Sequence, residues 1–236
     1  MKDPIYAPKG KAAEYADLAL NLYTGCTNGC EYCYAPSVLR KSREDFTRCV
    51  EPRKGILEAL ERQLLSGDFA GKTIHLCFTC DPFPSGVDTQ VARDAIELLK
   101  GADANVQILT KNPSIAAHSC ACQLGKKDSI GTTITGAPQS VEPNAESSEL
   151  RLSALEAVHD LGIGTWISCE PIIDPEVIYE LISTCDFVDL FKFGKLNYAT
   201  SDLDWAQVGK RVERLCREHD RCYMIKDSLR KEMVAR

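Results

Sequence analysis

Apolar and polar positions follow two alternating patterns along this chain. Short runs of consecutive apolar residues, typical of strands covered on both faces, recur six times. Between them lie longer segments in which apolar residues recur every three or four positions, which predicts helices with one buried face. No long linker interrupts the series. The predicted strands are 16–23, 73–79, 106–110, 129–135, 163–169 and 187–193, and the predicted helices are 55–65, 89–99, 114–124, 149–161, 175–183 and 205–219.

Six strands, each followed by a helix, predict a parallel sheet with right-handed crossover connections. The pattern alone fits both an open doubly wound sheet and a barrel. A short run at 222–225 is interpreted as a last strand before a final helix at 227–234. We therefore expect residues 1–203 to form the main domain and residues 204–236 to form a C-terminal helical extension packed on it.

Composition limits the classes of protein to which this chain can belong. The chain has 236 residues, which suits one large α/β domain. Its net charge of −6 disfavours a broad basic face for gripping nucleic acid. Two local basic groups, Arg40 to Arg43 and Lys226 to Lys231, are expected to be solvated helix faces. No apolar run approaches the roughly 20 residues that span a bilayer, so no membrane contact is expected.

The chain contains 12 cysteines and begins without a charged-then-apolar leader. This combination predicts a reducing, cytoplasmic environment. Three of the cysteines, Cys26, Cys30 and Cys33, stand in one short loop with the spacing C-x3-C-x2-C. Thiolates this close suit one soft metal centre. Because iron–sulfur clusters normally take four cysteines, three would leave one iron free for a substrate or cofactor.

Three other accounts of this motif compete with a cluster. A structural zinc site needs four closed ligands, whereas the next cysteine is Cys49 and the first histidine is His75. A disulfide framework needs an oxidising compartment. Unliganded core thiols would be poorly patterned in a loop that contains Gly25 and Gly29. The spacing therefore favours an iron–sulfur cluster.

The motif resembles that of the radical S-adenosylmethionine (SAM) superfamily, whose members place an aromatic residue just before the third cysteine. Tyr32 holds that place. The resemblance implies a partial (β/α)6 TIM-like barrel with the cysteine loop just after the first strand, and so decides between the open sheet and the barrel. It also implies a 4Fe–4S cluster on Cys26, Cys30 and Cys33, with SAM as the second cofactor. In such barrels the chemistry gathers at the C-terminal ends of the strands.

Polar residues follow the second and third strands. The superfamily uses the position of Asp81 to contact the amino group of SAM, and a carboxylate would do so through a charge-assisted bond. Capping a turn before Pro82 is the alternative. Lys111 would meet the SAM carboxylate or a substrate phosphate as a mobile point charge. As a lysine at a strand end, it would otherwise only add solubility.

Further polar residues follow the later strands. The Thr133 hydroxyl would bond the SAM ribose or carboxylate, although threonine is ordinary in a strand. Glu170 and Lys192 would hold the ribose hydroxyls or the substrate, or would form a structural ion pair across the barrel mouth.

Within the superfamily, the chain is most similar to spore photoproduct lyase-related proteins. The similarity runs from about residue 18 to residue 193. In the lyases, a cysteine at the end of the second strand returns a hydrogen atom to the product, and a tyrosine after the cluster assists. Tyr34 matches that tyrosine, and Cys77 or Cys80 approximately matches the cysteine. The segments that carry the similarity are 21–34, 79–83, 109–111, Glu142-Pro143 and Arg151-Leu152.

The chain also departs from the lyases. It is shorter and acidic, and it shows no basic hairpin for opening a duplex, which a lesion enzyme needs. The segment 204–236 is too small to hold a duplex in an evident way. Cys77 and Cys80 would equally serve as packed thiols, since free cysteine is among the most buried residue types.

The resemblance implies that one-electron reduction of the cluster cleaves SAM and that the resulting 5′-deoxyadenosyl radical abstracts hydrogen from a substrate. The cofactors supply this chemistry, and the protein supplies orientation. The expected reductant is a flavodoxin or ferredoxin. A nucleic-acid-related substrate is expected, and modification of a protein, peptide or small metabolite is the alternative. A non-enzymatic zinc-binding or interaction module is a further alternative. An auxiliary cluster would favour the protein, peptide or metabolite; its candidate ligands are Cys120, Cys122, Cys169, Cys185, Cys216 and Cys222.

Overall fold

The computed structural model describes residues 3–197 and 200–234, so the outermost residues of both predicted domains, and 198–199, lie outside the described residues. Its centre is one sheet of eight strands that follow each other in chain order, from β1 at one edge to β8 at the other. The strands are β1 (Ile5–Tyr6), β2 (Leu18–Leu20), β3 (Thr73–Leu76), β4 (Asn105–Thr110), β5 (Ser129–Thr133), β6 (Gly164–Cys169), β7 (Leu190–Phe193) and β8 (Tyr223–Ile225).

The sheet confirms the predicted partial barrel. Strands β2 to β7 are the six predicted strands, and each pairs in parallel with the next. The segment at 222–225 adds β8 in parallel to β7. The unpredicted β1 adds an antiparallel strand to the other edge. Since β1 and β8 are the two edges, the sheet stays open.

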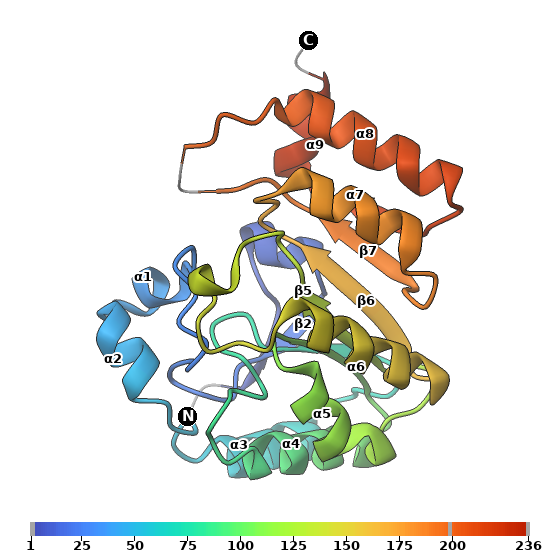
Figure 1. Ribbon diagram of the computed structural model, residues 1–236. Coiled ribbons are helices and arrows are strands. Elements are labelled where there is room, and N and C mark those ends of the chain that lie inside the picture. The colour runs from blue at the N-terminus through green and yellow to red at the C-terminus, as the bar shows by residue number, and fades with distance from the viewer. Residues whose placement is uncertain (1–2, 198–199, 235–236) are drawn as a thin grey trace.

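Helices cover the outer side of the sheet. Figure 1 shows α4, α5 and α6 side by side along one part of the sheet and α7, α8 and α9 packed together at the end of the sheet where β7 lies. The helices are α1 (Ala35–Leu39), α2 (Arg43–Arg48), α3 (Ile56–Ser66), α4 (Gln90–Gly101), α5 (Pro113–Cys120), α6 (Ser148–Asp160), α7 (Pro175–Thr184), α8 (Trp205–Glu218) and α9 (Asp227–Val234).

The longer helices begin where their sequences predict. The Ser147 hydroxyl accepts from the Leu150 backbone N–H at 3.3 Å and caps α6. Asp174 caps α7, and Pro175 occupies its first position, where a missing N–H costs nothing. Asp204 caps α8 through the backbone N–H groups of Ala206 and Gln207. These caps satisfy donors that the first helical turn leaves unpaired.

Helices α1 and α2 form a small lobe beside the sheet (Figure 1). The basic group Arg40 to Arg43, predicted as a helix face, instead forms the turn between them, except for Arg43, which begins α2. Arg40 has φ +55° and ends α1 in the left-handed conformation, and Ser42 caps α2. The prediction for Lys226 to Lys231 is also wrong at its first residue, because Lys226 is buried and precedes α9.

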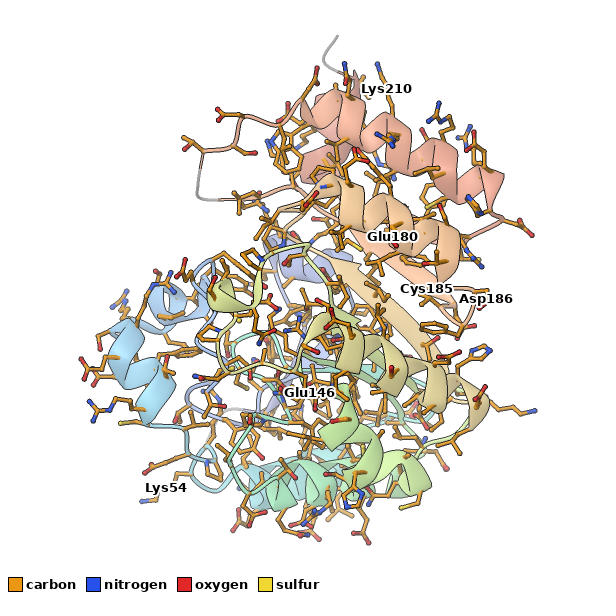
Figure 2. The ribbon with its side chains drawn as sticks, in the orientation of Figure 1. Lys54, Glu146, Glu180, Cys185, Asp186 and Lys210 are labelled. Atoms are coloured by element: carbon orange, nitrogen blue, oxygen red, sulfur yellow. The ribbon has the colours of Figure 1, made fainter. Side chains whose placement is uncertain are left out.

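The sheet and its helices enclose one apolar core, and several cysteines belong to it. Cys120, Cys169, Cys185 and Cys216 are buried there. Figure 2 shows Cys185 beside Asp186 at the end of α7, away from the lobe of α1 and α2. Among residues 3–197 and 200–234, no three His, Cys, Asp or Glu side chains stand ready to hold a metal. The auxiliary cluster stays a prediction.

No helix within the described part of the chain is both long and apolar enough to cross a membrane.

Candidate active site

A cavity of about 610 Å³ opens at the C-terminal ends of the strands. It brings together eleven of the twelve side chains that the sequence singled out, from segments spread over most of the chain. Lys192 is the exception. The eleven are Cys26, Cys30, Tyr32, Cys33, Tyr34, Cys77, Cys80, Asp81, Lys111, Thr133 and Glu170.

The cysteine loop, residues 25–33, follows β2 and is held against α2. The backbone N–H of Cys26 donates to the Phe46 carbonyl at 3.0 Å. A Cβ on Gly25 would overlap that carbonyl, so glycine permits this close approach. The Arg43 guanidinium donates to the Cys30 carbonyl at 3.1 Å and to the Cys33 carbonyl at 3.3 Å. The lobe of α1 and α2 therefore supports the loop from outside.

Asp81 supports the same loop from inside the barrel. Its carboxylate accepts from Asn28 Nδ2, within the loop, at 2.8 Å. It also accepts from the backbone N–H of Phe83 at 2.9 Å, which caps the turn, and from Thr110 Oγ1 and the Lys111 N–H. The turn-capping alternative is therefore present in the structure. The contact between Asp81 and SAM stays a prediction.

The three thiols of the loop form a donor set that fits a cluster. All three line the cavity, and three cysteines on one loop are the soft ligands that iron prefers. Burial raises the pKa of each thiol, that of Cys30 to about 11, and Lys111 partly offsets the effect there. The thiols are therefore protonated at neutral pH. Because the thiolate is the form that binds iron, metal binding requires these thiols to deprotonate.

Behind the loop lies a buried ion network around Glu142. Its carboxylate pairs with Arg151 Nη2 at 2.6 Å and with Lys111 Nζ at 3.4 Å, and it accepts from the Tyr32 hydroxyl. Lys111 Nζ also lies 5.3 Å from the centre of the Tyr32 ring. Burial alone would raise the pKa of Glu142, but Lys111 and Arg151 hold it below its usual value. The network fixes Tyr32 and Lys111 in place.

Two further sulfurs enter the cavity just after β3. Cys77 is buried, and Cys80 accepts from the Tyr23 backbone N–H at 3.4 Å. Burial raises the pKa of Cys77, and the neighbouring Cys77 thiol contributes to lowering the pKa of Cys80 against the effect of its own burial. The nearby Tyr34 is half-exposed, and its hydroxyl donates to the Phe78 carbonyl at 2.8 Å.

A charged cluster, formed by Tyr15, Ser168, Glu170 and Lys226, lines another part of the cavity. Lys226 Nζ lies 2.9 Å from Glu170 Oε2 and 4.3 Å from the centre of the Tyr15 ring. The Tyr15 hydroxyl donates to the same oxygen at 2.7 Å and lies 2.7 Å from Ser168 Oγ. Burial and then the Glu170 charge raise the pKa of Tyr15 well above its usual value. Tyr15 therefore stays a neutral donor.

The structural alternative, an ion pair between Glu170 and Lys192, is wrong, because Glu170 pairs with Lys226. Lys192 pairs with Ser168 in the sheet register and lies one residue before the end of β7. Its ammonium lies below the cavity, 4.6 Å from the Tyr15 ring centre and 4.5 Å from that of Trp166. Burial, followed by the Lys226 charge, lowers the pKa of Lys192 to about 8.

Sequence reasoning missed Asn28, Tyr15 and Lys226. Asn28 lies inside the cysteine motif, and its Oδ1 also accepts from Asn112 Nδ2 at 3.0 Å. A polar residue between two cysteines, each preceded by a glycine, could have indicated that Asn28 belongs to the site. Tyr15 precedes β2 and follows a short helical turn at 10–14, and Lys226 begins a basic run that indicates a surface face. Neither has a local pattern that points to the barrel mouth.

Comparisons with known proteins agree with this geometry. No family model matches the chain. An uncharacterised protein of Methanocaldococcus jannaschii, MJ0683, is 26% identical over 211 residues, which cover 85% of this chain and 77% of that protein.

Two solved structures are similar in fold. A doubly substituted mutant of spore photoproduct lyase, with bound SAM and a dinucleoside spore photoproduct, matches with TM-score 0.70 and 17% identity over 95% of this chain and 79% of the lyase. Streptococcus suis SuiB bound to SAM matches with TM-score 0.64 and 14% identity over 92% of this chain and 52% of SuiB. The chain therefore has the fold of these two SAM-binding proteins, the partial barrel that its cysteine motif predicted.

Proposed function

We propose that this protein is a radical SAM enzyme. The observation that carries the proposal is the position of Cys26, Cys30 and Cys33 on one loop at the mouth of a partial barrel, facing a cavity of about 610 Å³. Two proteins of the same fold have been crystallised with SAM, which supports the choice of cofactor. A zinc-binding module is less well supported, because a structural zinc site needs four ligands, whereas the next cysteine along the chain is Cys49 and the first histidine is His75.

In this proposal Cys26, Cys30 and Cys33 would hold a 4Fe–4S cluster. With SAM and an electron from a flavodoxin or ferredoxin, this cofactor pair would supply the radical chemistry that removes hydrogen from a substrate.

In this proposal the chain's own residues bind and orient SAM and the substrate. Tyr32 covers the cysteine loop and is held by Glu142, and the Lys111 ammonium lies between that carboxylate and the cavity. Lys111 is placed to attract the SAM carboxylate, and Thr133 offers a hydroxyl from β5. The aromatic and apolar lining excludes water, which protects a radical from quenching.

We further propose that the substrate is nucleic-acid-related. Structures of spore photoproduct lyase contain a dinucleoside photoproduct, and the chain spans 79% of that enzyme. Three lysines also line the cavity away from the cysteine loop: Lys9, Lys11 and Lys226. Lysine is a point charge suited to phosphate. In an acidic protein, this local excess of cations favours an anionic substrate. Cys77 or Cys80, with Tyr34, remains our proposal for the hydrogen-returning groups.

The test begins with anaerobic reconstitution with iron and sulfide, followed by dithionite and SAM. We expect the wild type to bind about four irons and to release 5′-deoxyadenosine, and Cys30→Ala to lose both. Cys122→Ala, which removes an exposed cysteine outside the cavity, is the matched control and should behave as the wild type. A wild type that binds iron but forms no 5′-deoxyadenosine would refute the proposal.

The substrate is tested separately, on enzyme that has passed the first test. Ultraviolet-irradiated DNA and irradiated dinucleotides should raise the yield of 5′-deoxyadenosine or consume photoproduct. If unirradiated and irradiated DNA give the same yield as buffer, while peptides or small metabolites raise it, the nucleic-acid proposal is wrong and the radical chemistry stands.

A further inference from the structure

Cys77 and Cys80 are close enough to act together. They are separated by two residues in the bend after β3, and both line the cavity. In Cys77-Phe78-Thr79-Cys80 the two cysteines have the C-x-x-C spacing, and each thiol affects the pKa of the other, as expected of neighbouring thiols. Neither is in a disulfide. Cysteines with this spacing are the pairs that disulfide oxidoreductases cycle between dithiol and disulfide.

The surroundings make the two sulfurs chemically different. The Cys80 sulfur accepts from the Tyr23 backbone N–H at 3.4 Å, and the Arg53 guanidinium contributes positive charge. Arg53 Nε is buried without a hydrogen-bond partner, and its Nη2 lies 3.4 Å from Thr79 Oγ1, next to Cys80 in the chain. Donors and a cation stabilise a thiolate, so Cys80 is the sulfur that ionises more readily.

Cys77 lies in the opposite environment. Its side chain is 5% exposed and is surrounded by the apolar core, and burial raises its pKa. Cys77 is therefore a neutral thiol that meets a reagent only after that reagent has reacted with Cys80.

We propose that Cys77 and Cys80 form a dithiol–disulfide couple facing the cavity, in which Cys80 is the attacking sulfur and Cys77 is the thiol that closes the bond. With oxidised glutathione, the Cys80 thiolate attacks one sulfur and releases glutathione thiolate. Cys77 then attacks the mixed disulfide, and its proton leaves with the second glutathione. Two cysteine thiols lose two electrons, and one glutathione disulfide becomes two glutathione molecules.

The couple goes beyond the proposed radical chemistry and does not depend on it. A dithiol beside the cavity holds two reducing equivalents next to whatever binds there. In its disulfide form it has no S–H bond, so it cannot return hydrogen to a product. The oxidation state of this pair would therefore decide whether the cavity can complete a reduction.

The experiment uses the metal-free full chain, reduced and then freed of reductant. After incubation with oxidised glutathione, free thiols are blocked with iodoacetamide and the protein is cut with trypsin. Thr73 to Arg93 form one tryptic peptide with Cys77 and Cys80 as its only cysteines. We expect this peptide to lose two hydrogens through an internal disulfide. If the exposed Cys222 is glutathionylated while this peptide stays reduced, the couple is refuted.

Two variants test the assignment of roles. In Cys77→Ser, Cys80 should accumulate as a mixed disulfide with glutathione. In Cys80→Ser, Cys77 should remain a free thiol. The reverse pattern would overturn the assignment, and a disulfide from Cys80 to Cys26, Cys30 or Cys33 would overturn the couple itself. Cys122→Ser is the control and should leave the wild-type pattern unchanged.

If either variant fails to fold, a measurement on the wild type still tests the proposal. Under limiting iodoacetamide, Cys80 should be alkylated at least about tenfold faster than Cys77, because alkylation requires an accessible thiolate. Equal rates at the two sulfurs would refute the difference on which the couple rests. No SAM, iron or activity enters this measurement, so its failure is distinct from failure of the radical SAM proposal.

Discussion

The cysteine loop and the charged cluster line the same cavity but are assembled in opposite ways. The loop takes its three thiols from residues 26–33, so their proximity is written into the local sequence. The charged cluster joins Tyr15, Glu170 and Lys226, which come from before β2, after β6 and after β8. Only the folded sheet brings them together. Function that depends on the loop can be recognised from a motif, whereas function that depends on the cluster needs the structure.

Their electrostatics differ as well. Around the cysteine loop, burial raises the pKa of the thiols, and Glu142 pairs behind the loop with Arg151 and with Lys111, whose ammonium reaches the cavity. In the charged cluster, the Glu170–Lys226 pair itself lines the cavity. We therefore expect mutations around the loop to affect cofactor loading, and mutations in the cluster to affect stability and substrate binding without affecting loading.

The largest expected effect comes from Glu142→Gln. The substitution keeps the shape of the side chain but leaves the buried Arg151 and Lys111 without a counter-charge, which costs about 3–5 kcal/mol. Urea unfolding measures the free energy of unfolding. Tyr32 should also lose its fixed position, so iron loading should fall. A variant with wild-type stability and loading would show that the network does not support the loop.

This effect should depend on pH in a defined direction. Lys111 and Arg151 hold the pKa of Glu142 in the folded protein below its value of about 4.3 in the unfolded chain. The carboxylate's contribution is therefore fully present above about pH 5 and is lost as the pH falls through the lower, folded value. The difference in stability between the wild type and Glu142→Gln should shrink below about pH 5. A difference that grows on acidification would contradict this assignment.

Lys226→Met tests whether the charged cluster and the cysteine loop act independently. It leaves the Glu170 carboxylate with only the Tyr15 hydroxyl, and because the Glu170 side chain keeps 17% of its surface exposed, the cost should be about 2–3 kcal/mol. Iron loading should match the wild type, and binding of an anionic substrate should weaken. The double variant Glu170→Gln/Lys226→Met should recover part of the stability. Lost iron loading in the single variant would mean that the two regions are not independent.

Asp81→Asn gives the smallest expected change in stability. The amide nitrogen would face either Asn28 Nδ2 and the Lys111 N–H or the donors on the other oxygen, at a cost of about 1–3 kcal/mol. Iron should load more slowly, because the loop loses its inner support. Asp94→Asn, on the outer helix α4, is the charge-matched control and should change neither quantity. Slower loading in both variants would point to net charge and not to the hydrogen bonds.

The comparison also explains what the sequence could and could not predict. The six strand–helix units follow directly from apolar periodicity, and strand ends place Asp81, Lys111, Thr133 and Glu170 in the cavity. Helices α1 and α2 escape prediction because they have five and six residues, too few to show a helical repeat. The pairing of Glu170 was mispredicted because it depends on how far β7 and β8 extend. How far these strands extend relative to one another depends on tertiary contacts and cannot be inferred from local sequence.

The cysteine loop is held by two hydrogen bonds from Arg43 to the Cys30 and Cys33 carbonyls and by one from Asn28 to Asp81. These bonds determine what should happen to the folded chain when iron is lost. These contacts hold the loop without any metal, so little ordering entropy remains to be lost when iron arrives. Small zinc domains unfold when their metal is removed. If the protein holds the proposed cluster, oxidative loss of that cluster should leave the chain folded and able to bind iron again. Damage by oxygen would then be repaired by supplying iron and sulfide again, and the cell would not need to synthesise the chain again.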